Sequence, residues 1–74
     1  MAWREMFYRH LACGDFIRVE LPGPPYRSTV LCVSRVEECD RGDLTERQYL
    51  IHGNYPRWFP GPIVVSHTDR TDTV

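Results

Sequence analysis

Apolar and polar residues alternate along several short stretches of this chain, and glycine or proline separates one stretch from the next. In residues 15–21, Ile17, Val19 and Leu21 alternate with charged neighbours, which is the period of a strand with one buried face. Four further runs rich in β-branched or aromatic residues are bounded by turn residues: 28–36, 47–52, 57–59 and 63–68. The pattern therefore predicts five short antiparallel strands.

The connections between these strands are short, and the stretch 48–65, with its Pro60-Gly61-Pro62 segment, is the centre of the organisation. Five short strands with tight turns suit either an SH3-like barrel or a small OB-like barrel. The chain length and the very short strand at 57–59 favour the SH3-like alternative. We expect a mainly β fold, a small five-stranded SH3-like antiparallel barrel, over residues 14–68.

The two ends of the chain have a different character. The apolar positions of residues 1–13 fall on one side of a helix: Trp3, Met6, Phe7, His10 and Leu11. Gly14 stands where a C-cap glycine belongs. We expect a short N-terminal amphipathic helix over residues 1–13 that packs on the barrel or, through Trp3 and Phe7, on a partner. The polar residues 69–74 are expected to form a frayed C-terminal tail.

The strand expected at 28–36 carries apolar residues on both sides. Leu31 and Val33 alternate with Val30 and Cys32, so we expect partial cover on both faces, with Cys32 as a small core residue. The next segment, 37–46, holds five acidic residues and one arginine, which is typical of a solvated hairpin connection. Later in the chain, the Tyr55–Pro56 step is compatible with a cis peptide bond.

Several of these segments together resemble a known group of proteins. They are Gly-Asp-Phe-Ile-Arg-Val at 14–19, Ser-Thr-Val-Leu-Cys-Val at 28–33, Gln-Tyr-Leu-Ile at 48–51 and Trp-Phe-Pro-Gly-Pro at 58–62. This order is similar to that of small SH3-like barrel proteins of actinobacteria, which are grouped only as a domain of unknown function. More distantly, it resembles Tudor-like barrels, which share a Trp-Phe-Pro turn. The resemblance covers roughly residues 14–66; it implies the fold and a bacterial or phage source, but no activity.

Size and charge narrow the function. Seventy-four residues make one domain, and nine basic against ten acidic residues leave a net charge of −1. This balance provides no long-range attraction to a polyanion, which disfavours a general nucleic-acid or membrane binder. No apolar run approaches the ~20 residues of a membrane span, and no export signal opens the chain. Three cysteines without a C-x-x-C pair indicate a reduced, cytoplasmic protein.

The sequence contains no arrangement that is typical of catalysis. Nucleophilic catalysis needs a residue activated by a neighbouring base, and none of Cys13, Cys32 and Cys39 has such a neighbour in the sequence. His10 and Cys13 form one pair with metal-ligand spacing, whereas structural zinc sites use close pairs from two segments. We therefore expect no enzyme, no cofactor and no metal site.

Aromatic residues outnumber the places available in so small a core. Tyrosine and tryptophan are common where one end of a ring is buried and the other is wet, and aromatic residues mixed with arginine are typical of binding hot spots. We expect Phe59 in the core and leave Trp58 open between core and surface. The predicted partner-binding residues are Tyr26, Arg27, Tyr55, Arg57, Trp58, Trp3 and Phe7.

Three functions follow from these observations. The favoured one is a small non-catalytic interaction module that binds a protein segment or self-associates, with a regulatory role. The second is a nucleic-acid-binding barrel in which aromatic rings stack on bases and four arginines contact phosphate: Arg18, Arg27, Arg35 and Arg57. Its binding would fall steeply with salt. The third is a small enzyme or accessory subunit, which would need a cofactor or a reactive cysteine.

Overall fold

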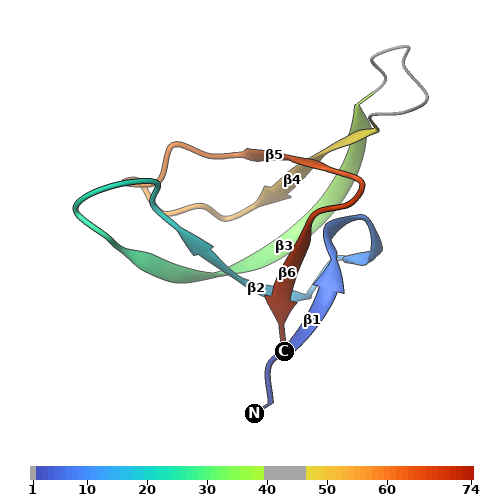
Figure 1. The fold of residues 1–74 in the computed structure, drawn as a ribbon, viewed down its shortest axis with the longest axis horizontal. Coiled ribbons are helices and arrows are strands. Elements are labelled where there is room, and N and C mark those ends of the chain that lie inside the picture. Colours follow the sequence, from blue (N-terminus) through green and yellow to red (C-terminus); the bar gives the residue numbers. More distant parts are fainter. Residues whose placement is uncertain (1, 40–46) are drawn as a thin grey trace.

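The computed structural model describes residues 2–39 and 47–74. Within them the fold is mainly β, with one six-stranded antiparallel sheet in the order β1-β6-β2-β3-β4-β5 (Figure 1). The strands are β1 (Arg4–Phe7), β2 (Phe16–Glu20), β3 (Ser28–Cys39), β4 (Gln48–Gly53), β5 (Ile63–Ser66) and β6 (Arg70–Thr73). A single-turn 3₁₀ helix, η1 (Tyr8–His10), follows β1. The described residues contain no α-helix.

The middle of the sheet is a meander, β2–β3–β4–β5, and it confirms four of the strands expected from the alternation. The long strand β3 pairs with β2 through its first part and with β4 through its second, and it bends strongly between them (Figure 1). The register shifts between Val33 and Arg35, which is a β-bulge that bends the strand. A Cβ at Gly53 would lie 2.8 Å from the carbonyl oxygen of Cys32, so this close approach of β4 to the bend requires glycine.

The core lies on the concave side of this bent sheet. Its fully buried side chains come from alternate positions of neighbouring strands: Ile17, Leu31, Val33 and Ile51. The bulge brings Val36 to the same side as Leu31 and Val33, where Val36 packs against the core. Cys32, by contrast, is exposed, so the expectation of a core cysteine was wrong. Cys32 lies between two buried neighbours and therefore points to the opposite face of the strand.

The expected N-terminal helix over residues 1–13 is also wrong. Residues 4–7 form strand β1, which pairs with β6 from Arg4 opposite Thr73 to Phe7 opposite Arg70. A helix of this length is marginal on its own, whereas a strand here gains a ladder of hydrogen bonds along β6. The period is two rather than 3.6: Met6 and Tyr8 pack against the core, and Phe7 between them stacks with Arg70 instead.

The expected frayed tail at 69–74 is instead strand β6, which lies between β1 and β2. Thr71 and Thr73 are buried on its inner side, and the hydroxyl of Thr73 donates a hydrogen bond of 2.8 Å to the carbonyl oxygen of Phe16. This bond removes the cost of burying the hydroxyl. The chain ends therefore lie side by side in the sheet (Figure 1).

The expected fourth strand at 57–59 is a turn, in which the Phe59 amide donates to the Pro56 carbonyl at 3.0 Å. Prolines at 56, 60 and 62 have no N–H to give to a ladder, which explains why no strand forms there. The sheet is not closed: β1 and β5 are its edges within the described residues. The expected closed barrel of five strands is thus an open, bent sheet of six.

Two smaller expectations concern the connections. β3 continues to Cys39, so the solvated segment expected at 37–46 begins later than the sequence suggested, and residues 40–46 lie outside the described residues. Cis peptide bonds occur in the described residues at Pro24–Pro25 and Gly61–Pro62, not at Tyr55–Pro56.

Candidate functional site

Four neighbouring strands, β1, β6, β2 and β3, present one side to the core and the other to solvent. We call the solvent side the outer face, and define it by residues 3, 5, 16, 18, 20, 30, 32, 70 and 72. Three of its side chains are large, apolar and exposed: Trp3 by 37%, Phe16 by 47% and Val30 by 52%. The register places Phe16 opposite the exposed Cys32, and Arg18 opposite Val30. Exposed apolar groups thus gather on one side of the sheet, which is uncommon in a monomer.

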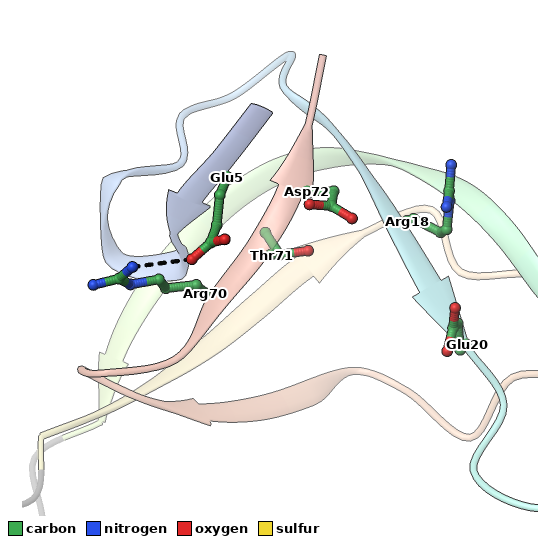
Figure 2. Close-up of a pocket in the computed structure, with 6 residues that line it drawn as sticks. All are labelled: Glu5, Arg18, Glu20, Arg70, Thr71 and Asp72. Carbon is green, nitrogen blue, oxygen red and sulfur yellow. Dashed lines mark hydrogen bonds and ion pairs between the residues drawn. The ribbon is translucent and has the colours of Figure 1, made fainter. Parts of the chain in front are cut away.

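A shallow groove of about 420 Å³ crosses the same face (Figure 2), lined by Thr71 and by five charged residues: Glu5, Arg18, Glu20, Arg70 and Asp72. Glu5 stands directly opposite Asp72, a pairing of like charges that destabilises a sheet. Arg70 offsets it by donating a hydrogen bond of 3.0 Å to the Glu5 carboxylate. Glu20 lies farther along the groove on β2, beyond Arg18 (Figure 2). The groove therefore holds both signs of charge within a few side chains of one another.

Aromatic rings hold the two arginines of the groove. The Arg18 guanidinium carbon lies 4.8 Å from the ring centre of Trp3, and that of Arg70 lies 4.5 Å from the ring centre of Phe7. Guanidinium groups stack on such rings through cation–π attraction. Trp3 and Phe7, predicted as partner-binding residues, therefore lie next to the charged groove, although Phe7 is the last residue of strand β1 and Trp3 directly precedes that strand.

A second cluster lies at the far end of the sheet, where the β2–β3 loop approaches the segment between β4 and β5 (Figure 1). Here the Arg27 guanidinium carbon lies 4.3 Å from the ring centre of Trp58. Tyr26 is 85% exposed, more than any other large hydrophobic side chain among the described residues. With Arg27 it lines an open pocket of about 170 Å³. The structure therefore places Tyr26, Arg27 and Trp58, three of the predicted partner-binding residues, at one end of the molecule.

Tyr55 belongs to the interior of this second cluster. Its ring stacks on Phe59 at 5.3 Å, and its hydroxyl donates to the Ile51 carbonyl at 2.7 Å and accepts from the Ile63 amide at 3.2 Å. Burial raises the pKa of the Tyr55 hydroxyl above its ordinary value of 10.0. A Cβ at Gly61 would lie 2.6 Å from the Tyr55 ring. These contacts make Tyr55 a brace between β4 and β5 rather than a partner-facing residue.

The remaining predicted site residue, Arg57, is exposed in the turn next to Trp58. Reasoning from the sequence missed Phe16, Val30, Arg70 and Asp72. A signal existed for Phe16, because it stands in phase with Arg18 and Glu20 on the polar side of an alternating strand. No comparable signal marked Arg70 and Asp72, since the segment that holds them was expected to be a tail.

A histidine–carboxylate pair joins β3 and β4. His52 Nε2 and the Glu37 carboxylate lie 2.7 Å apart on β4 and β3, and this hydrogen bond, with the Arg35 guanidinium, holds the pKa of Glu37 below its ordinary value of 4.5. No group of three or more potential metal ligands comes together in residues 2–39 and 47–74. The same residues contain no helix long and apolar enough to cross a membrane.

Comparison with protein-family models, with curated proteins and with solved structures finds no match for this chain.

Proposed function

We propose that this protein is a non-catalytic interaction module whose outer face binds a second copy of the chain. The observation that carries the proposal is the exposure of Trp3, Phe16 and Val30 on the solvent side of four neighbouring strands of the sheet, β1, β6, β2 and β3. Removing apolar surface from water contributes a favourable free energy of about 25 cal/mol per Å². Two antiparallel sheets can stack face to face about 10 Å apart. A second sheet stacked on the outer face would cover these three side chains.

The charges on the outer face favour a second copy as the occupant. The face carries carboxylates at Glu5, Glu20 and Asp72 and guanidiniums at Arg18 and Arg70. A dimer with two-fold symmetry pairs one patch with the same patch of the other subunit, so a patch of mixed sign can place its arginines against the carboxylates of the partner. A purely acidic or purely basic patch would repel its own copy.

Sedimentation velocity over a range of concentrations tests this proposal. The wild-type protein is expected to form dimers, and Phe16→Ser should weaken dimerisation at least about tenfold, because large interface side chains dominate binding. Tyr26→Ser is the matched control, since Tyr26 is exposed at the other end of the molecule; it should leave dimerisation unchanged. A wild-type protein that stays monomeric at millimolar concentration would overturn the proposal, as would a dimer that Tyr26→Ser, but not Phe16→Ser, disrupts.

One observation favours a second candidate, binding of single-stranded nucleic acid at the far cluster. Exposed Tyr26 lies beside the Arg27–Trp58 stack, and rings next to arginine can stack on bases. Of the four arginines considered for phosphate contacts, Arg35 lies 3.7 Å from the Glu37 carboxylate and Arg18 is on the outer face. Binding of a labelled oligonucleotide that falls steeply between low and moderate salt, and that Tyr26→Ser abolishes, would support this candidate.

The resemblance to small SH3-like barrel proteins belongs to the proposal as well. The strongly bent strand β3, shared between β2 on one side and β4 on the other, supports it for the meander β2–β3–β4–β5. In this interpretation β1 and β6 are additions at the edge of an SH3-like core, and they supply much of the outer face.

A further inference from the structure

A third surface differs from the outer face in its chemistry and adjoins it at Phe7, whose ring is stacked by both Arg9 and Arg70. An open pocket of about 390 Å³ is lined by Arg9, Arg47, Tyr49 and His67. These side chains come from η1, from the start of β4 and from the turn after β5. The lining contains two guanidiniums, a phenol and an imidazole, and none of the four residues is acidic. In a chain with a net charge of −1, this concentrates positive charge in one concave place.

Backbone contacts fix the pocket wall. The His67 amide donates to the Arg47 carbonyl at 2.8 Å, and the Arg9 guanidinium donates through Nη1 to the His67 carbonyl. The Arg9 guanidinium carbon also lies 4.1 Å from the ring centre of Phe7. Arg9 is therefore held in place by a ring on one side and a carbonyl acceptor on another, so it loses little further side-chain freedom when it binds an anion.

Arg47 and His67 can each contact a ligand in the pocket. Arg47 lies 3.7 Å from the Glu38 carboxylate, which is longer than a charge-assisted hydrogen bond of about 2.7–2.9 Å, and both side chains are more than half exposed. The Nδ1 atom of His67 is buried and has no hydrogen-bond partner within the described residues. The imidazole therefore gives up no hydrogen bond from this atom if it turns toward a ligand.

We infer that this pocket binds a phosphate group. Arginine presents a planar fork of donors that matches phosphate oxygens, and two arginines line this pocket together with a tyrosine and a histidine. The source of the group can be inorganic phosphate or a phosphomonoester, since the pocket is open on one side. The Glu38 carboxylate opposes binding, because it competes for Arg47 and repels the anion.

A titration monitored by amide chemical shifts tests the inference at constant ionic strength. Inorganic phosphate is expected to shift residues 47, 49 and 67 saturably, and O-phosphoserine compared with phosphate distinguishes the two sources: tighter binding indicates a phosphomonoester, and equal binding indicates the phosphate group alone. Arg47→Gln should weaken binding about tenfold, in keeping with the loss of one charge-assisted contact. Glu38→Gln should tighten it a few-fold.

Arg4→Gln is the matched control, because Arg4 is an exposed arginine outside the pocket lining; it should not change the affinity. The inference is overturned if chloride or acetate produces the same shifts at the same concentration, or if Arg4→Gln weakens binding as much as Arg47→Gln. It is also overturned if Glu38→Gln weakens binding. Arg9→Gln is a poorer variant, since Arg9 also holds the His67 carbonyl.

Discussion

Each of the two tryptophans of this protein is stacked by an arginine, but the surroundings of the two pairs differ. Trp58 has the Arg27 guanidinium carbon 4.3 Å from its ring centre, and Trp3 has that of Arg18 at 4.8 Å. The Phe59 ring lies 5.9 Å from that of Trp58 in an edge-on arrangement, and Trp58 packs against the hydrophobic core. Trp3 stands on the outer face and is 37% exposed.

This difference shows that an arginine stacked on a tryptophan does not define the role of the ring. The remaining contacts of each tryptophan ring determine its role. At Trp58 the arginine covers a side chain that already contributes to folding, whereas at Trp3 it covers a side chain that stands on the outer face. The two can therefore be separated by their effects on stability and on association.

The largest expected effect on stability comes from deleting β6, the strand that pairs with β1 directly after Trp3. A chain that ends at Asp69 lacks β6, the strand between β1 and β2. Because β1 then has no strand partner and Ile17 loses its neighbour Thr73, we expect the free energy of unfolding to fall by more than about 3 kcal/mol, a large share of the roughly 4–11 kcal/mol expected for this length. Urea denaturation followed by circular dichroism measures it.

Asp72→Ser is the control for this deletion, since Asp72 is an exposed residue of β6 opposite Glu5. It should change the free energy of unfolding by less than about 0.5 kcal/mol. An equally stable truncated chain would mean that residues 70–74 are a dispensable tail, and the position of Trp3 in the sheet would then have to be reconsidered.

The next effect separates the tryptophans directly. Trp58→Ala should lower the free energy of unfolding by about 2–3 kcal/mol, somewhat less than the ~3–5 kcal/mol of a fully buried tryptophan, because Trp58 is only half-buried. The dimer affinity, corrected for any unfolded fraction, should not change. A Trp58→Ala protein as stable as wild type would show that the ring is a surface platform, as one of the two sequence hypotheses had it.

How much of this arrangement could be predicted from the sequence differs between the middle and the ends of the chain. The meander was predictable because Ile17 and Val19 alternate with charged neighbours, because the run at 28–36 is rich in β-branched residues, and because turn residues separate the runs. Phe59 was expected in the core and is buried there. These signals are local, so they do not depend on the rest of the fold.

Strands β1 and β6 could not be predicted in this way. Trp3 and Phe7 are four residues apart, a spacing that places both on one helix face and also, because it is even, on one strand face. Thr71 and Thr73 alternate with charged residues, but nothing in Thr-Asp-Thr indicates burial without the Phe16 carbonyl that satisfies Thr73. Both strands depend on each other across the whole chain, and the outer face was missed with them.

A smaller effect on stability is expected at the other tryptophan. Trp3→Ala should change the free energy of unfolding of the monomer by less than about 1 kcal/mol, since its ring is partly exposed and lies outside the core. In sedimentation velocity the same variant should dimerise at least about tenfold more weakly, because tryptophan is enriched among interface hot spots. Loss of stability comparable to Trp58→Ala, with unchanged association, would remove the distinction between the two rings.

The smallest expected effect is a pH dependence of stability that arises where β3 pairs with β4, the strand before the Trp58 turn. The Glu37 carboxyl has its pKa held below 4.5 by the hydrogen bond with His52 and by the Arg35 guanidinium. A carboxyl whose pKa is lowered by folding stabilises the protein above the unfolded pKa, and this contribution disappears as the pH falls through the lower, folded value. Wild type should therefore exceed Glu37→Gln in stability at pH 6–7, and the difference should shrink toward pH 2–3.

Urea denaturation of both proteins at several pH values measures this difference, and Glu37→Gln removes the charge while keeping the shape of the side chain. Glu37 lies on β3 where it pairs with β4, away from the outer face, so the variant should leave dimerisation unchanged at neutral pH. A stability difference that stays constant from pH 7 to pH 3 would contradict the role of the ionised carboxylate. A change in dimerisation would instead mean that the two halves of the sheet are coupled, and that neither tryptophan can be assigned to stability or association alone.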